Sequence, residues 1–107
     1  MINYLSPFKS QALKEGNNIA YTVPSLTVSQ VRALTFHNTT GNAVSIEVYV
    51  SANLDIALSQ RLVKKTLAQN ESYLCPEVIN HVLTEGMAIT LVGLGVNAML
   101  SVMEQSR

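Results

Sequence analysis

The sequence predicts an all-β protein, an antiparallel β-sandwich of the jelly-roll or immunoglobulin-like kind. Two observations lead to this prediction: apolar and polar residues alternate in short segments, and turn-forming residues recur about every ten positions. Helical periodicity is almost absent. Short strands separated by turns, without helices between them, are typical of sandwiches and barrels.

The clearest alternation covers residues 44–51, where Val or Ile occupies every second position and Ser, Glu or Tyr stands between them. A period of two is typical of a strand with one buried face. Residues 29–37 form a further strand candidate in which both alternating sets are partly apolar, as in a strand covered on both faces. The residues between the two segments, 38–42 (NTTGN), favour a tight turn because Asn and Gly tolerate positive φ. We therefore expect residues 29–51 to form a hairpin.

The carboxyl-terminal part repeats this pattern. Residues 87–92 and 96–103 alternate, and Gly93-Leu94-Gly95 between them permits a tight reversal, which predicts a second hairpin. Further strands are expected at residues 18–23, 61–67 and 72–75, whereas 54–59 fits either a loop or a helical turn.

One short crossover helix is expected near residues 76–84. Pro76 suits the first position of a helix, because its missing N–H has no partner there in any case. The apolar residues that follow are spaced i, i+1, i+4 and i+5, which is one face of about two helical turns. Gly86 would then end the helix in a left-handed conformation. The four apolar residues are Val78, Ile79, Val82 and Leu83.

The chain of 107 residues is expected to be one domain, 1–107. Its first seventeen residues show little pattern, and two interpretations stay open for residues 1–17. They could form an N-terminal arm that becomes ordered against a partner. Alternatively, Tyr4, Leu5 and Phe8 could seal one end of the sandwich.

Composition excludes several function classes. Charged residues are only 13% of the chain and the formal net charge is zero, so little electrostatic repulsion opposes association with other proteins. Nucleic acid is not expected as a partner, because phosphate binding requires a basic surface. A membrane span is not expected either, since the most apolar stretch, 87–103, is shorter than the ~20 residues of a spanning helix. The single cysteine cannot form an internal disulfide.

The segment Tyr73–Gly86 gathers Cys75, Glu77 and His81, which raises the question of a thiol-based active site. A reactive cysteine needs an electropositive setting, and Glu77 would oppose it. We therefore expect a small buried thiol and a surface Glu77–His81 pair four residues apart. No motif for catalysis, a cofactor or a metal is present, so the sequence predicts a non-enzymatic protein without cofactors.

The order of these segments resembles the small β-sandwich virion proteins of tailed bacteriophages. Four elements within residues 29–92 carry the resemblance: the NTTG turn, a Tyr-x-x-Pro-Glu turn at 73–77, His-Val-Leu at 81–83 and Gly-x-x-Ile at 86–89. The resemblance implies a capsid decoration protein of the cement or staple type, without catalysis. Such a protein binds across neighbouring subunits of the major capsid protein and stabilises the head.

The expected location is the surface of the virion capsid, after synthesis in the host cytoplasm, and the expected arrangement is a homo-oligomer or a multi-copy lattice. One alternative is a head–tail connector, tail, baseplate or head-fibre-base component with the same fold. A second alternative is a module that binds a host glycan or protein. Exposure and charge select three regions as candidate partner contacts, the N-terminal segment, the 38–42 turn and the basic 61–65 strand. The candidate residues are Tyr4, Phe8, Lys9, Asn38, Thr39, Thr40, Asn42, Arg61, Lys64 and Lys65.

Overall fold

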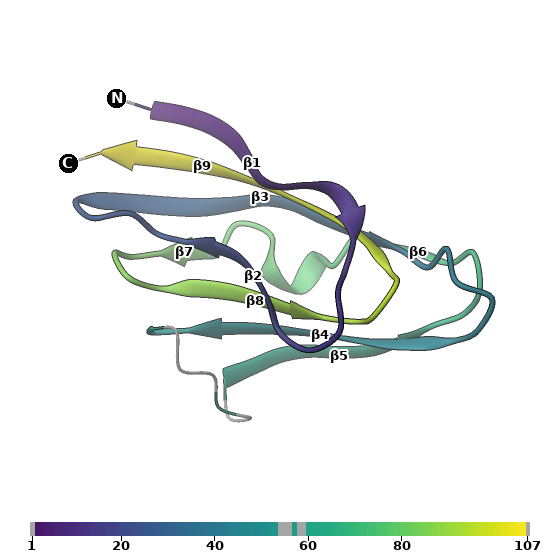
Figure 1. The fold of residues 1–107 in the computed structure, drawn as a ribbon. Coiled ribbons are helices and arrows are strands. Elements are labelled where there is room, and N and C mark those ends of the chain that lie inside the picture. Colours follow the sequence, from purple (N-terminus) through teal and green to yellow (C-terminus); the bar gives the residue numbers. More distant parts are fainter. Residues whose placement is uncertain (1, 54–56, 58–59, 107) are drawn as a thin grey trace.

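The computed structural model describes residues 2–53, 57 and 60–106, which form two antiparallel sheets packed face to face (Figure 1). Most of the segment 54–59, for which the sequence left two alternatives, lies outside the described residues. Sheet A contains β1 (Ile2–Ala12), β3 (Thr27–His37), β6 (Ser72–Tyr73), β7 (Val82–Leu83) and β9 (Asn97–Ser106). Sheet B contains β2 (Asn18–Thr22), β4 (Val44–Ser51), β5 (Arg61–Leu67) and β8 (Ala88–Val92).

The strand order is that of a jelly roll. Sheet A runs β1-β9-β3-β6 and sheet B runs β2-β8-β4-β5. The short strands β6 and β7 pair with opposite ends of β3, so together they act as one interrupted strand. If β6 and β7 are counted as a single sixth strand, β8 becomes the seventh strand and β9 the eighth. The two sheets then have the orders 1-8-3-6 and 2-7-4-5, which is the jelly-roll arrangement. The prediction of an antiparallel sandwich is confirmed, and of its two variants the structure has the jelly roll.

Both predicted hairpins are wrong, although their strands are present. β3 lies in sheet A and pairs with β9, whereas β4 lies in sheet B and pairs with β5 and β8. The turn at 38–42 therefore crosses between the sheets. The turn at 93–95 does the same between β8 and β9. Alternation indicates that one face of a strand is buried, but it does not indicate which strand lies beside it.

The core lies between the sheets and explains why both strands of each predicted hairpin alternate. Leu34 and Phe36 of sheet A are fully buried, as are Ile46, Val48 and Leu91 of sheet B. Burying each such side chain contributes about 1.5–3 kcal/mol relative to leaving it in water. The two sheets are thus held together mainly by apolar packing across the core.

The predicted helix is also wrong, because the chain makes only one 3₁₀ turn, Pro76–Val78. Pro76 does stand in the first turn, as expected. Beyond it the backbone leaves the helical path, since Asn80 N donates to Val31 O at 2.8 Å and Val31 N donates to His81 O at 3.0 Å. Backbone groups that a second helical turn would need are therefore bonded to the edge of β3.

The N-terminal segment is part of the sandwich. β1 pairs with β9 at the edge of sheet A, with two irregularities in its register, between Leu5 and Phe8 and between Phe8 and Gln11. Leu5 and Phe8 pack against the core, and Leu13 just beyond the strand is buried. Of the three residues that the second interpretation named, Leu5 and Phe8 thus contact the core, whereas Tyr4 is exposed.

One end of the sandwich, on the right in Figure 1, is formed by the connections 38–43, 68–71 and 93–96 and is called the loop end. Asn38 joins two of these connections. Its side chain is buried, and Nδ2 donates to the carbonyl oxygens of Asn42, Leu67 and Ala68 at 2.8, 3.0 and 3.2 Å. Its Oδ1 accepts from the backbone N and the Oγ1 of Thr40 at 3.0 and 2.7 Å. The β3–β4 and β5–β6 connections are thereby fixed to each other.

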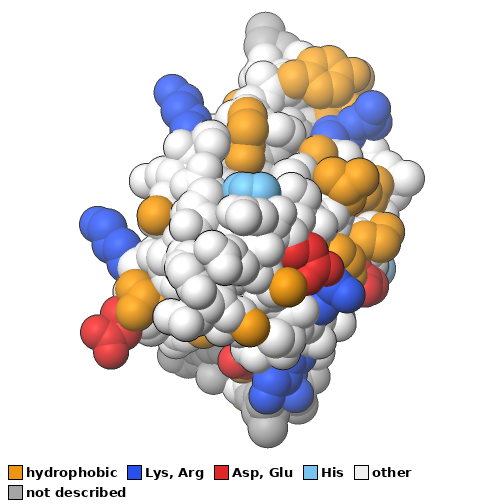
Figure 2. Space-filling model, turned by 90° about the vertical axis from the view of Figure 1, so that its right-hand side faces the viewer, with side chains coloured by type: hydrophobic (Ala, Val, Ile, Leu, Met, Phe, Trp, Pro, Cys, Tyr) orange, Lys and Arg blue, Asp and Glu red, His pale blue; other side chains and the backbone are white. Residues whose placement is uncertain are grey.

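The β8–β9 connection lies against the same end. Gly95 has φ +84°, and a Cβ added there would lie 2.8 Å from Thr40 Cγ2, so the close approach of the two loops requires glycine. Gly95 N also donates to Leu13 O at 2.9 Å. Figure 2 looks onto this end, where neutral side chains and backbone cover most of the centre.

Replacing Asn38 by Ala should destabilise the protein by about 2–4 kcal/mol, because several buried polar groups lose their partners at once. Urea unfolding followed by circular dichroism measures this free energy. Asn42→Ala is the control in the same loop: Asn42 is exposed and its bonds run through backbone atoms, so its loss should stay within about 0.5 kcal/mol. Equal stabilities of the two variants would contradict the role given to the Asn38 amide.

Candidate interaction surfaces

Cys75 does not form an active site with Glu77 and His81. Its side chain is fully buried, as predicted, and burial raises the pKa of the thiol to about 12, with a smaller contribution from Glu77. The predicted Glu77–His81 pair is wrong, because no helix places these residues one turn apart. The Glu77 carboxylate instead accepts hydrogen bonds from the Tyr73 hydroxyl, which lower the pKa of Glu77.

The Cys75 thiol should react with a thiol reagent such as DTNB far more slowly in the folded protein than in urea. At pH 8 a thiol with a pKa of about 12 is ionised in about one molecule in ten thousand, against about one in four for an ordinary cysteine. The rate of absorbance change in each state measures this difference. Similar rates in the folded and unfolded protein would show that the thiol is accessible and reopen the question of a reactive site.

Among residues 2–53, 57 and 60–106, no three His, Cys, Asp or Glu side chains are grouped so that they could hold a metal ion. The same part of the chain contains no helix long and apolar enough to cross a membrane.

The ten predicted contact residues do not form one surface. The prediction is wrong for Asn38, which is buried and bonded within its own loop, and Phe8 packs against the core. Tyr4 and Lys9 are exposed on β1, and Tyr4 is 72% exposed. The remaining candidates lie at the loop end (Thr39, Thr40 and Asn42) and on β5 (Arg61, Lys64 and Lys65). β1 and β5 are edge strands of different sheets.

Each sheet edge carries a feature that hinders the addition of another strand. β1 contains Pro7 and two register irregularities, and β5 carries Lys64 and Lys65. β2 has five residues and an irregular register, and the β6–β7 edge is interrupted by the 3₁₀ turn. Proline, lysine, bulges and short strands are the usual means of protecting edges from pairing with other chains. A partner would therefore contact the faces or the ends of the sandwich rather than extend a sheet.

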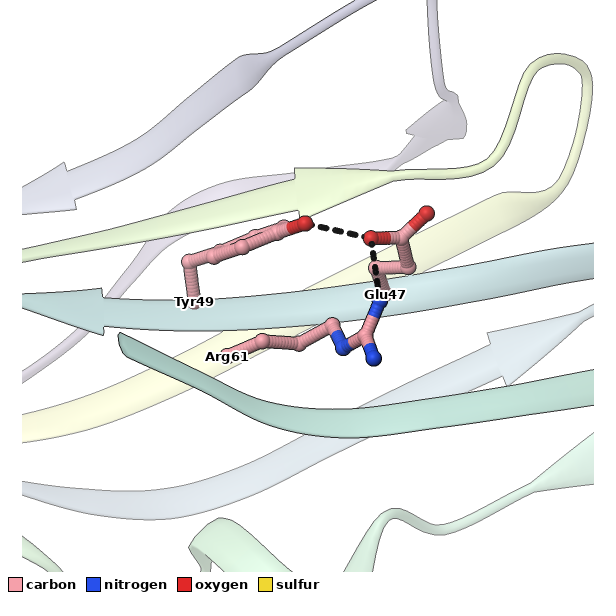
Figure 3. Close-up of polar contacts among 3 residues, drawn as sticks. All are labelled: Glu47, Tyr49 and Arg61. Atoms are coloured by element: carbon pink, nitrogen blue, oxygen red, sulfur yellow. Dashed lines mark hydrogen bonds and ion pairs between the residues drawn. The ribbon is translucent and has the colours of Figure 1, made fainter. Parts of the chain in front are cut away.

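The outer face of sheet B carries charges that are matched within the chain. Glu47 and Tyr49 project from the same side of β4, and Arg61 reaches Glu47 from β5 (Figure 3). Tyr49 donates a hydrogen bond to the Glu47 carboxylate, and Arg61 Nη1 lies 3.4 Å from Glu47 Oε1. The pKa of Glu47 is lowered, mainly by the hydrogen bond from Tyr49 and further by Arg61.

Thr90 shows that neighbouring side chains already cover the middle of this face. It pairs with Tyr49 on β4 and with Ile19 on β2, and only 1% of it is exposed. Among the described residues its Oγ1 has no hydrogen-bond partner. Side chains on the two flanking strands therefore shield the centre of sheet B from a partner.

Tyr49→Phe should raise the pKa of Glu47 towards its ordinary value of about 4.3, because the largest influence on it is removed. In the wild type the ionised form is favoured in the folded state, so this stability is present above about pH 4.3 and is lost as pH falls through the lower folded pKa. Above about pH 4.3 the variant should therefore be less stable than the wild type. The difference should be no more than about 1 kcal/mol, because these groups are partly exposed.

NMR titration of the glutamate carboxyl groups measures this change. The pKa of Glu77, which depends on Tyr73 instead, is the internal control and should not move. An unchanged Glu47 pKa in the variant would show that the hydrogen bond from Tyr49 does not persist in solution.

The outer face of sheet A has two shallow hollows over β9. The first, about 260 Å³, lies between Tyr4 and Ser6 of β1 and Arg32 of β3. The Oγ atoms of Ser6 and Ser101 lie 3.4 Å apart within it. It coincides with irregularities in both flanking strands, which redirect side chains locally.

The second hollow, about 240 Å³, lies nearer the loop end and is lined by Ser10, Thr35, His37, Asn97, Ala98 and Met99. Asn97 Nδ2 donates to Ser10 Oγ at 3.2 Å, and His37 Nδ1 lies 2.6 Å from Ser72 Oγ. Each hollow thus offers hydroxyl groups together with one basic side chain, Arg32 or His37.

Arg32 was absent from the sequence-based candidates. Within the described part of the chain its guanidinium has no hydrogen-bond or ion-pair partner, in contrast to Arg61. No sequence signal separates the two arginines, since both stand in alternating strands. The distinction depends on Glu47, which the fold places beside Arg61 in sheet B, whereas Arg32, equally near to Glu47 along the chain, lies in sheet A.

No family model, curated protein or solved structure matches the chain.

Proposed function

We propose that this chain is a non-enzymatic structural protein of a tailed-bacteriophage virion that binds across neighbouring major capsid protein subunits and stabilises the head. Its role is then that of a capsid decoration protein, present in many copies on the virion surface. The observation that carries the proposal is the outer face of sheet A, which is formed by three long strands, while the sheet edges are poorly suited to the addition of another strand.

The sequence and the fold both support this proposal. The ordered motifs of residues 29–92 resemble small virion sandwiches, and jelly rolls are common in viral capsid proteins, although lectins and cupins share the fold. The charged fraction of 13% and the net charge of zero leave little repulsion between copies, or between a copy and a shell.

The size of the face indicates how strong one contact can be. β1, β3 and β9 have 10 or 11 residues each. Three strands of this length cover about 500 Å², from a rise of about 3.3 Å per residue and a spacing of about 4.8 Å. A standard interface takes about 800 Å² from each partner, so one copy alone would bind weakly. Copies that also contact one another on a closed lattice add these modest free energies.

Adding the purified protein to undecorated heads, assembled from the major capsid protein encoded in the same genome, tests the proposal. The protein should sediment with the heads, saturate at roughly hundreds of copies and raise the temperature at which the heads open. Electron microscopy of the decorated heads gives the copy number and the position.

A heated, unfolded sample of the same protein is the control for nonspecific adsorption. Saturation at a ring of about six or twelve copies would favour the head–tail or tail alternative instead. Binding to host cell-surface sugar, with no binding to heads, would support the third alternative and rule out decoration.

A further inference from the structure

We infer that the outer face of sheet A binds a carboxylate-bearing protein surface, with Arg32 in the first hollow as the central contact. This inference rests on the proposed function, because it specifies the chemistry by which the capsid subunit would be recognised. It depends on how charges are distributed between the faces and the interior of the fold.

Acidic groups are nearly absent from sheet A. Its five strands contain a single acidic residue, Glu104. The Glu104 carboxylate accepts a hydrogen bond from the hydroxyl of Tyr21, a buried residue of sheet B, so it points inward. The outer face therefore presents Arg32 and the imidazole of His37 without a carboxylate of the same sheet beside them.

Most described carboxylates are engaged within the chain, whereas several cations are not. Glu71 accepts from Ala68 N at 2.7 Å, and Glu85 accepts from Leu26 N at 2.6 Å. Glu47, Glu77 and Glu104 accept hydrogen bonds from tyrosine hydroxyls. Although the net charge is zero, most described carboxylates are therefore hydrogen-bonded to donors of the same chain, and several basic side chains are left without such a partner.

Arg32 is suited to this contact because its five N–H donors are free among the described residues, and it is exposed beside a hollow. A guanidinium can bind a carboxylate through two parallel hydrogen bonds. The neighbouring hydroxyls of Ser6 and Ser101 can donate to the same group, and the adjacent Tyr4 supplies an exposed ring. Arginine and tyrosine, together with tryptophan, are enriched among the residues that dominate binding energy at protein interfaces.

The two hollows suit an extended segment rather than a single ion. Arg32 and His37 are five residues apart on β3, which corresponds to about 16 Å along the strand. A segment lying along β9 could therefore place one carboxylate in each hollow. A protein is favoured over nucleic acid because phosphate binding depends on many cations, and these strands offer few beside Met99 and other neutral side chains.

Binding to the undecorated heads should fall about tenfold or more in Arg32→Glu, and less in Arg32→Gln, because the first change adds repulsion to the lost contact. Lys14→Glu is the matched control: it makes the same charge change in an exposed loop outside the face and should bind as the wild type does. Circular dichroism and thermal unfolding verify that each variant is folded.

Unchanged binding of Arg32→Glu to heads that bind the wild type would overturn the inference and leave decoration intact. A loss confined to Lys64→Glu would likewise overturn it, because the contact would then lie on β5. If the wild type binds no heads, the proposed function fails, and the face is tested separately with an oligoglutamate peptide.

In that titration, NMR amide shifts should concentrate on β1, β3 and β9 and disappear in Arg32→Glu. Shifts elsewhere, or none, would overturn the inference. A single-stranded oligonucleotide is the comparison: stronger shifts of the same amides with it than with oligoglutamate would identify a nucleic-acid surface and overturn the assignment to a protein.

Discussion

The buried amide of Asn38 is the polar contact on which the arrangement of this sandwich most depends. In a jelly roll most connections pass from one sheet to the other, so their backbone groups cannot all pair with a neighbouring strand. The Asn38 side chain supplies partners for carbonyl groups of two such connections at once. Apolar packing holds the sheets together but has no direction, whereas this amide fixes how the loops meet.

Most strands could be predicted from the sequence, but β1 and β7 were missed and the pairing could not be predicted. Segment 44–51 alternates clearly and became β4, because one buried face determines the period of the side chains. The residues of the NTTGN turn are those typical of hairpins, yet the Asn38 side chain points inward and binds carbonyl groups at the end of β5 and in the β5–β6 loop. That contact joins residues about thirty positions apart, and no local pattern contains it.

The expected helix failed for a related reason. The apolar spacing from Val78 to Leu83 fits two helical turns, but it also fits one 3₁₀ turn followed by a strand. In the structure Val78 and Leu83 are buried while Val82 is 59% exposed. The backbone groups of Asn80 and His81 form hydrogen bonds with Val31 of β3, about fifty positions away in the sequence. Tertiary hydrogen bonds therefore decided between two local conformations that the sequence left nearly equivalent.

The same limit applies to the surfaces, where the number of basic residues matters less than which of them are already paired. The basic 61–65 strand attracts attention in the sequence, but Arg61 binds Glu47 and Lys65 lies 5.0 Å from the centre of the Tyr73 ring. Arg32 stands alone in its segment and gives no such signal. Binding a partner costs desolvation at any cation, but a cation that is already paired also loses its internal contact, and Arg32 has none to lose among the described residues. The proposed contact therefore lies on sheet A around Arg32, although β5 is the more basic strand by sequence.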